Sequence, residues 1–86
     1  MYEIFYSKRA VKDIAKLKSA GLDGKAKELV ETVKRNPYQN PPRYEKLLGD
    51  WAGYYSRRIN RHHRLIYKVD EARRIVKIYR LWTHYE

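Results

Sequence analysis

The sequence predicts a small α+β domain in which a two-helix hairpin covers one face of an antiparallel, twisted sheet, in the order β-α-α-β-β-β-β. Two observations lead to this prediction. Between residues 7 and 36 apolar residues recur at helical spacing, whereas from residue 44 onward apolar and polar residues alternate as in strands. All three prolines lie between these regions, and 86 residues make one domain, which we expect to span residues 1–86.

The first half is predicted to form one strand and two helices. Tyr2 to Tyr6 is aromatic and β-branched, which is typical of a short strand. Ser7 is placed to cap the first helix and Asp23 to cap the second, which should end before Pro37. A short link around Gly21 predicts an antiparallel pair of helices. The residues expected to be buried are Ala10, Val11, Ile14, Leu17, Leu22, Ala26, Leu29, Val30 and Val33.

The second half is predicted to form a stiff proline-rich loop at residues 36–43, followed by a meander of strands. The expected strands are Glu45 to Leu48, Tyr54 to Ile59, His63 to Val69 and Arg73 to Trp82. Alternation places Leu65 and Tyr67 on the face that packs against the helices, and therefore Arg64 on the open face. Arg58 lies on the adjacent strand of the same hairpin, so we expect the two arginines to come close together.

The formal net charge of +10 predicts an anionic partner. Nucleic acid is the first candidate, and an anionic membrane or an acidic protein is the alternative. Tyrosine and tryptophan are interleaved with the basic residues, which favours RNA. The absence of cysteine suits a reducing cytosol, residues 1–5 are too polar for a signal peptide, and no apolar stretch approaches a membrane span. We therefore expect a cytoplasmic protein with no membrane partner.

Several kinds of chemistry are disfavoured by what the sequence lacks. There is no cysteine, and the three histidines have no recognised ligand spacing, so we expect no metal site. There is neither a glycine-rich phosphate loop nor a serine-nucleophile motif, which argues against ATP-driven and acyl-transfer reactions. We accordingly expect no cofactor.

RNA cleavage without a metal ion needs a base, cations for the charge on phosphorus, and an acid for the leaving oxygen. Glu45, the pair Arg58 and Arg64, and His84 supply one residue type for each task. Tyr85 could stack on or orient a base. The alternatives are that Glu45 only pairs with neighbouring cations and that the two arginines are solvated surface charges.

The chain resembles the YoeB/Txe branch of the RelE/ParE toxin superfamily through motifs that occur in order along its second half. They are Tyr44-Glu45-Lys46-Leu47, Gly53-Tyr54-Tyr55-Ser56-Arg57-Arg58-Ile59, His63-Arg64-Leu65-Ile66-Tyr67 and His84-Tyr85. The first half agrees more loosely, as a strand, a helical hairpin and the loop Arg35-Asn36-Pro37-Tyr38. The resemblance implies a RelE-like fold.

The resemblance also implies an activity, which is ribosome-dependent endonucleolytic cleavage of mRNA by a metal-independent toxin. By resemblance, Glu45 is the general base, His84 the general acid, Arg64 the ligand of the scissile phosphate with Arg58 supporting it, and Tyr85 a substrate-positioning residue. The implied partners are mRNA in the ribosomal A site, ribosomal RNA, an inhibitory antitoxin of the YefM type with an acidic segment, and a second toxin copy in a homodimer.

The chain departs from the family pattern around His84. Glu86 follows the His-Tyr pair, and Trp82 and Thr83 stand where an arginine-aromatic pair is more usual. Two other functions remain open on the sequence: a ParE-like poison of DNA gyrase with the same fold, and a non-catalytic nucleic-acid-binding module.

Overall fold

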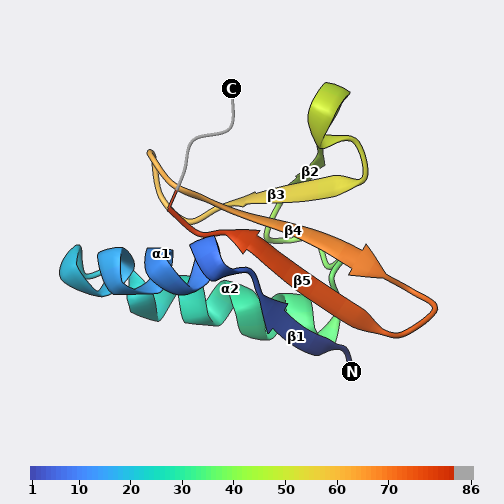
Figure 1. The fold of residues 1–86 in the computed structure, drawn as a ribbon, viewed down its shortest axis with the longest axis horizontal. Coiled ribbons are helices and arrows are strands. Elements are labelled where there is room, and N and C mark those ends of the chain that lie inside the picture. Colours follow the sequence, from blue (N-terminus) through green and yellow to red (C-terminus); the bar gives the residue numbers. More distant parts are fainter. Residues whose placement is uncertain (83–86) are drawn as a thin grey trace.

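The computed structural model of the chain describes residues 1–82, which form one five-stranded sheet with two helices packed side by side against one face (Figure 1). The helices are α1 (Lys8–Ser19) and α2 (Asp23–Arg35). The strands are β1 (Glu3–Tyr6), β2 (Tyr44–Lys46), β3 (Tyr54–Arg58), β4 (Arg64–Asp70) and β5 (Ile75–Arg80), with a single 3₁₀ turn at Gly49–Trp51. The predicted α+β class and element order are confirmed. No described helix has the length and apolar character that crossing a membrane requires.

The sheet is mixed rather than antiparallel throughout, which corrects the prediction at one edge. In the strand order β1-β5-β4-β3-β2, the last three pairings are antiparallel, but β1 runs parallel to β5 from Glu3 opposite Ile75 to Tyr6 opposite Ile78. Short turns force β2 to β5 to alternate in direction. No hairpin joins β1 to its neighbour, so nothing local in the sequence dictates its direction.

The core lies between the helices and the sheet. Leu65 and Tyr67 are fully buried there, as their alternation predicted. Val11 was expected in the core but is 57% exposed, and Asp13 is buried instead with 2% exposure. The buried positions of α1 are 10, 13 and 17, which share one helical face, whereas position 11 lies about 100° away from position 10.

The two helices begin in different ways. Ser7 caps α1 as predicted, because its Oγ accepts a hydrogen bond of 3.0 Å from the N–H of Ala10. The prediction that Asp23 caps α2 is wrong. Leu22 holds the capping position without a side-chain hydrogen bond, and Asp23 is the first helical residue. A carboxylate in that first turn still stabilises the positive end of the helix dipole.

Candidate functional site

Glu45, Ser56, Arg58 and Arg64 lie on the sheet face that the helices leave uncovered. In the register of the sheet, Glu45 on β2 is opposite Ser56 on β3. Arg58, two residues further along β3, is opposite Arg64 on β4. Since directly paired residues and residues two apart point to the same side, all four side chains share one face. The structure thus brings together three of the five predicted site residues.

Arg64 joins the three strands through its guanidinium group. Its Nη1 lies 3.7 Å from the Oε1 of Glu45 and donates a 3.3 Å hydrogen bond to the Oγ of Ser56. The Glu45 side chain is 47% exposed and that of Arg64 is 22% exposed. Such a pair can contact a substrate hydroxyl through the solvent-exposed carboxylate and the neighbouring phosphate through the guanidinium group.

These residues line a hollow of about 230 Å³. Its walls are Pro42, Arg43, Glu45, Ser56, Arg58 and Arg64. Three guanidinium groups face one carboxylate, so the hollow is suited to an anion, and a forked guanidinium matches the oxygens of a phosphate group. Within residues 1–82, no three histidine or acidic side chains lie close enough together to hold a metal ion.

A larger hollow of about 380 Å³ lies on the other side of the molecule, between the helices and the ends of β1 and β5. Tyr6, Ile14 and Leu81 contribute to its mainly apolar wall. It contains no pairing of a carboxylate with arginines like the one between Glu45 and Arg64, so the smaller hollow is the better candidate for chemistry.

Arg57 holds the proline-rich loop that leads into β2, and the sequence reasoning missed it. It is 1% exposed, and its Nη2 and Nη1 donate to the carbonyl oxygens of Pro37 (3.0 Å) and Pro42 (2.5 Å). Its Nε donates to the hydroxyl of Tyr67 (3.1 Å), which in turn donates to the Pro37 carbonyl (2.7 Å). Burial raises the pKa of Tyr67 to about 12, and the Arg57 charge partly offsets that rise. Arg57 thereby fixes the segment that presents Glu45.

The signal for Arg57 was present in the alternation of β3. Arg57 is opposite Leu65, which alternation had placed in the core, so Arg57 occupies a core position. A charged residue at such a position requires strong hydrogen-bonding partners. None of the ion pairs between described residues involves Arg57. Backbone carbonyls and aromatic rings supply its compensation instead, including the ring of Tyr44 at 4.9 Å.

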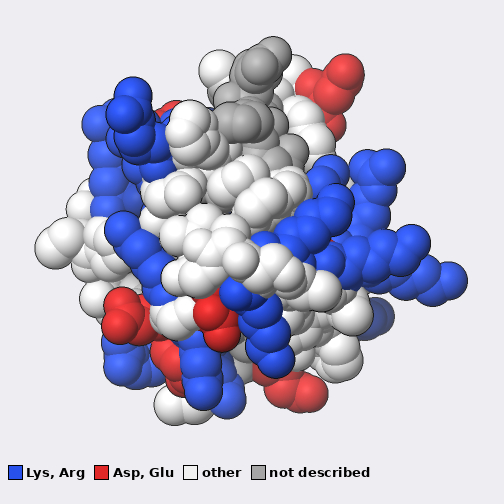
Figure 2. Space-filling view, turned by 90° about the vertical axis from the view of Figure 1, so that its left-hand side faces the viewer, with Lys and Arg blue, Asp and Glu red and all other residues white. Residues whose placement is uncertain are grey.

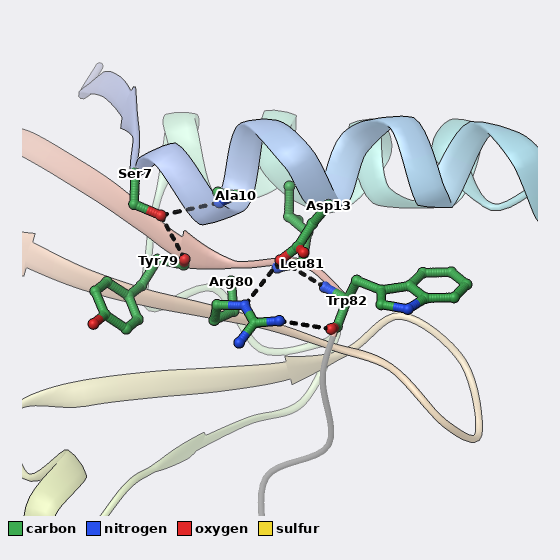
Figure 3. A network of polar contacts seen from close by, with 7 residues as sticks. All are labelled: Ser7, Ala10, Asp13, Tyr79, Arg80, Leu81 and Trp82. Carbon is green, nitrogen blue, oxygen red and sulfur yellow. Dashed lines mark hydrogen bonds and ion pairs between the residues drawn. The ribbon is translucent and has the colours of Figure 1, made fainter.

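The end of β5 is attached to α1 by two side chains (Figure 3). Ser7 Oγ donates to the carbonyl of Tyr79 (2.6 Å). The Oδ2 atom of Asp13 accepts from the N–H groups of Leu81 (2.9 Å) and Trp82 (3.2 Å). It also forms an ion pair with the Nε of Arg80 at 3.0 Å. Asp13 was not singled out from the sequence, although it is the one acidic residue in the otherwise basic α1.

His84 and Tyr85, the remaining predicted site residues, lie outside the described residues. Trp82 is the last described residue, and its indole stacks on the ring of His63 with centroids 3.8 Å apart and an interplanar angle of 18°. His63 stands in the loop between β3 and β4, where the side chain of Asn60 accepts hydrogen bonds from the N–H groups of His62 (2.9 Å) and His63 (2.8 Å). The chain leading to His84 is therefore held from both sides up to residue 82.

Three aromatic side chains form a second group on the open face, which the sequence reasoning also missed. Trp51, Tyr54 and Tyr79 have ring centroids 5.3 to 5.5 Å from one another. The ammonium group of Lys68 lies 5.4 Å from the centre of the Tyr54 ring. Tyr54 is two residues from Ser56 on the same strand, so this group adjoins the arginine-lined hollow. Aromatic rings beside cations are typical of surfaces that contact single-stranded nucleic acid.

The surface is predominantly basic, in keeping with the net charge of +10. Seen from the side, lysine and arginine side chains gather at both edges of the molecule, and lower down they also lie between the edges, next to acidic side chains (Figure 2). Acidic side chains are scattered in small groups. Such a distribution attracts a polyanion from more than one direction and raises its rate of association.

The chain was compared with known proteins. The family model of the YoeB-like toxins of bacterial type II toxin-antitoxin systems matches residues 6–85. A curated relative, the toxin YoeB of Streptomyces coelicolor, is 38% identical over 48 residues. That match covers 56% of this chain and 57% of the relative, so it spans a little over half of each.

Solved structures match over nearly the whole chain. A YoeB/ParE toxin from Agrobacterium tumefaciens is 28% identical, with a TM-score of 0.87 over 96% of this chain and 99% of that one. YoeB from Staphylococcus aureus is 34% identical. It matches in a heterotetrameric complex with YefM (TM-score 0.81, 99% of both chains) and as a dimer (TM-score 0.82, 98% of both chains).

Proposed function

Since this chain belongs to the family of YoeB-like toxins of bacterial type II toxin-antitoxin systems, we propose that it is a metal-independent endoribonuclease that cuts mRNA in the ribosomal A site and thereby inhibits translation. The observation that supports this best is the contact between Glu45 and Arg64 beside an arginine-lined hollow on the open face. In this proposal the carboxylate is the base and the guanidinium group is the phosphate ligand, and their closeness suits a 2′-hydroxyl and the phosphate beside it.

In the proposed reaction, the 2′-oxygen attacks the adjacent phosphorus and the bond from phosphorus to the 5′-oxygen breaks. Glu45 takes the proton of the 2′-hydroxyl, and Arg64 with Arg58 stabilises the charge that builds up on the phosphate oxygens. His84 gives a proton to the departing 5′-oxygen, and Tyr85 positions the substrate. The products are a 2′,3′-cyclic phosphate, which can open to a 3′-phosphate, and a 5′-hydroxyl.

The proposed partners follow from charge and from the relatives. A protein with a net charge of +10 is attracted to ribosomal RNA, which would bring the hollow to the message in the cytoplasm. Staphylococcus aureus YoeB forms a complex with YefM. We propose for this chain a YefM-like antitoxin whose acidic segment covers the arginines. The dimer of the same relative supports a toxin homodimer.

Inducible expression in cells without an antitoxin tests the proposal. The wild type should arrest growth and cut translated messages, whereas Glu45→Ala and His84→Gln should do neither at equal protein levels. Asp50→Asn, which removes an acidic charge outside the hollow, serves as the matched control and should behave as the wild type. Survival of both growth and message in the wild type would refute the proposal.

The same experiment separates the two alternative functions. A gyrase poison of this fold would induce the DNA-damage response before any loss of message, and it would not need Glu45 together with His84. A nucleic-acid-binding module would leave the message uncut in every variant.

A further inference from the structure

The buried carboxylate of Asp13 accepts its described hydrogen bonds from the last three described residues of the chain (Figure 3). Asp13 is 2% exposed on α1, and the residues that it contacts are 67 to 69 positions further along the chain. Burying a carboxylate is costly unless it is well compensated. Here two backbone N–H groups and one guanidinium group compensate it, at distances of 2.9 to 3.2 Å.

These contacts orient the backbone at Leu81 and Trp82 rather than determine how deeply Leu81 is buried. Leu81 is already 2% exposed, so apolar packing alone would keep the end of β5 in place. Asp13 adds bonds to the N–H groups of two consecutive residues. Arg80 completes the arrangement, because its Nη2 donates to the carbonyl of Trp82 at 3.1 Å while its Nε holds Asp13. The peptide groups on both sides of Trp82 are thereby oriented, and the stacking on His63 orients its side chain.

We propose that Asp13 is a positioning residue for the general acid, acting through Arg80 and the backbone of Leu81 and Trp82. This inference rests on the proposed function, in which His84 protonates the leaving oxygen. A chain advances at most about 3.5 Å per residue, so the orientation at Trp82 limits where a residue two positions later can act. A general acid must come within hydrogen-bonding distance of its oxygen, and an error of about 1 Å costs on the order of a hundredfold in rate.

The test compares two messages on programmed ribosomes under single-turnover conditions. One has the natural 5′-oxygen at the cut site, and the other has a bridging sulfur there. Sulfur leaves as a thiolate, with a pKa near that of cysteine, about 8.5, and therefore needs no acid. Asp13→Asn, which keeps the shape and removes the charge, should cut the oxygen message about tenfold to a hundredfold more slowly. It should cut the sulfur message within about threefold of the wild-type rate.

Two site variants calibrate the comparison. His84→Gln should also cut the oxygen message slowly and the sulfur message at close to the wild-type rate. Glu45→Gln should cut both messages slowly, because the base is still needed. In the His84→Gln background, Asp13→Asn should add nothing, since both changes would remove the same step. Equal slowing of Asp13→Asn on both messages, or wild-type rates on both, would overturn the inference.

Folding is controlled by variants of the same contact region. Ser7→Ala removes the hydrogen bond to the Tyr79 carbonyl but leaves the hydrogen bonds of Asp13. It should therefore lower stability without slowing cleavage of the oxygen message more than that of the sulfur message. Should Asp13→Asn fail to fold, Arg80→Lys takes its place. It keeps a cation beside Asp13, loses the bond to the Trp82 carbonyl, and should show the same recovery on sulfur.

The outcomes also separate this inference from the proposed function. If the wild type cuts neither message, the proposed function fails. If the wild type and His84→Gln behave as expected while Asp13→Asn matches the wild type, only the positioning role is lost.

Discussion

Arg64 contacts Glu45 and Ser56, which belong to two other strands, so its guanidinium group has little freedom to move. A cation fixed before the substrate arrives stabilises developing charge without the cost of reorganisation. We expect Arg64→Gln to slow the chemical step by about a hundredfold to a thousandfold while the protein stays folded. Single-turnover cleavage on programmed ribosomes measures this rate.

Arg73→Gln is the matched control for that prediction. It removes the same charge from a side chain that is 79% exposed and pairs only loosely with Asp70, at 3.9 Å. Its rate should stay close to that of the wild type. An equal loss in both variants would mean that Arg64 contributes only to the general attraction of RNA.

Tyr67 makes stability depend on pH at the alkaline end. Its pKa is raised by burial from 10.0 to about 12, so the folded state holds the phenolic proton more tightly than the unfolded state does. That contribution is complete below pH 10 and is lost as the pH rises through 12. The free energy of unfolding from urea titrations should therefore fall between about pH 10 and 12, and less steeply in Tyr67→Phe. Identical slopes for the two proteins would contradict the assignment.

Simple alternation predicted which side chains share the open face, and the sequence reasoning missed residues whose contacts are with distant partners. Arg58 and Arg64 were expected to meet, and they are opposite each other in the β3–β4 pairing. Arg57 and Asp13 were missed because their partners, Pro42 and Leu81 among them, lie 15 and 68 residues away. Local periodicity contains no information about such contacts.

At the level of elements, the contacts between α1 and the end of β5 hold the last described part of the chain in place. Ser7 has two roles there, as the cap of α1 and as a donor to the Tyr79 carbonyl. Ser7→Ala should lower the free energy of unfolding by about 1–2 kcal/mol, through the lost cap and the unpaired carbonyl. Urea unfolding checks this value. Ser19→Ala, at the exposed end of the same helix, should change it by less than about 0.5 kcal/mol.

Element types were predictable and strand neighbours only partly so. The helical spacing of Ala10 and Leu17 and the alternation through Leu65 and Tyr67 reflect burial that each segment experiences on its own. Hairpin turns then fix the antiparallel neighbours of β3 and β4. The parallel pairing of β1 with β5 joins the two ends of the chain. Neither this pairing nor the edge of the sheet at which β1 lies follows from local pattern.

For the whole molecule, the described core is built from residues between Tyr2 and Leu81, with Trp82 packed against it. Deleting His84 to Glu86 should therefore leave the circular dichroism spectrum unchanged and the melting temperature within a few degrees, while cleavage is abolished. In a domain of this size, a fall of about 4–8 °C in melting temperature would correspond to a loss of about 1 kcal/mol in the free energy of unfolding. A truncated chain that folds and still cuts mRNA would exclude His84 as the acid.

The net charge of +10 comes from residues along the whole chain rather than from the hollow alone. Binding to RNA should therefore weaken steeply as salt is raised, because each neutralised phosphate releases a counterion. Glu45→Gln should keep that salt dependence while losing cleavage. That outcome would separate RNA binding from the proposed catalysis.

The central claim is tested most directly by the chemical nature of the ends that purified protein leaves on mRNA in programmed ribosomes. Attack by the 2′-oxygen, with Glu45 as base and Arg64 on the phosphate, predicts a 2′,3′-cyclic phosphate or 3′-phosphate on one fragment and a 5′-hydroxyl on the other. It also predicts that Glu45→Gln leaves the message intact. Fragments with a 3′-hydroxyl and a 5′-phosphate, or undiminished cutting by Glu45→Gln, would contradict the account.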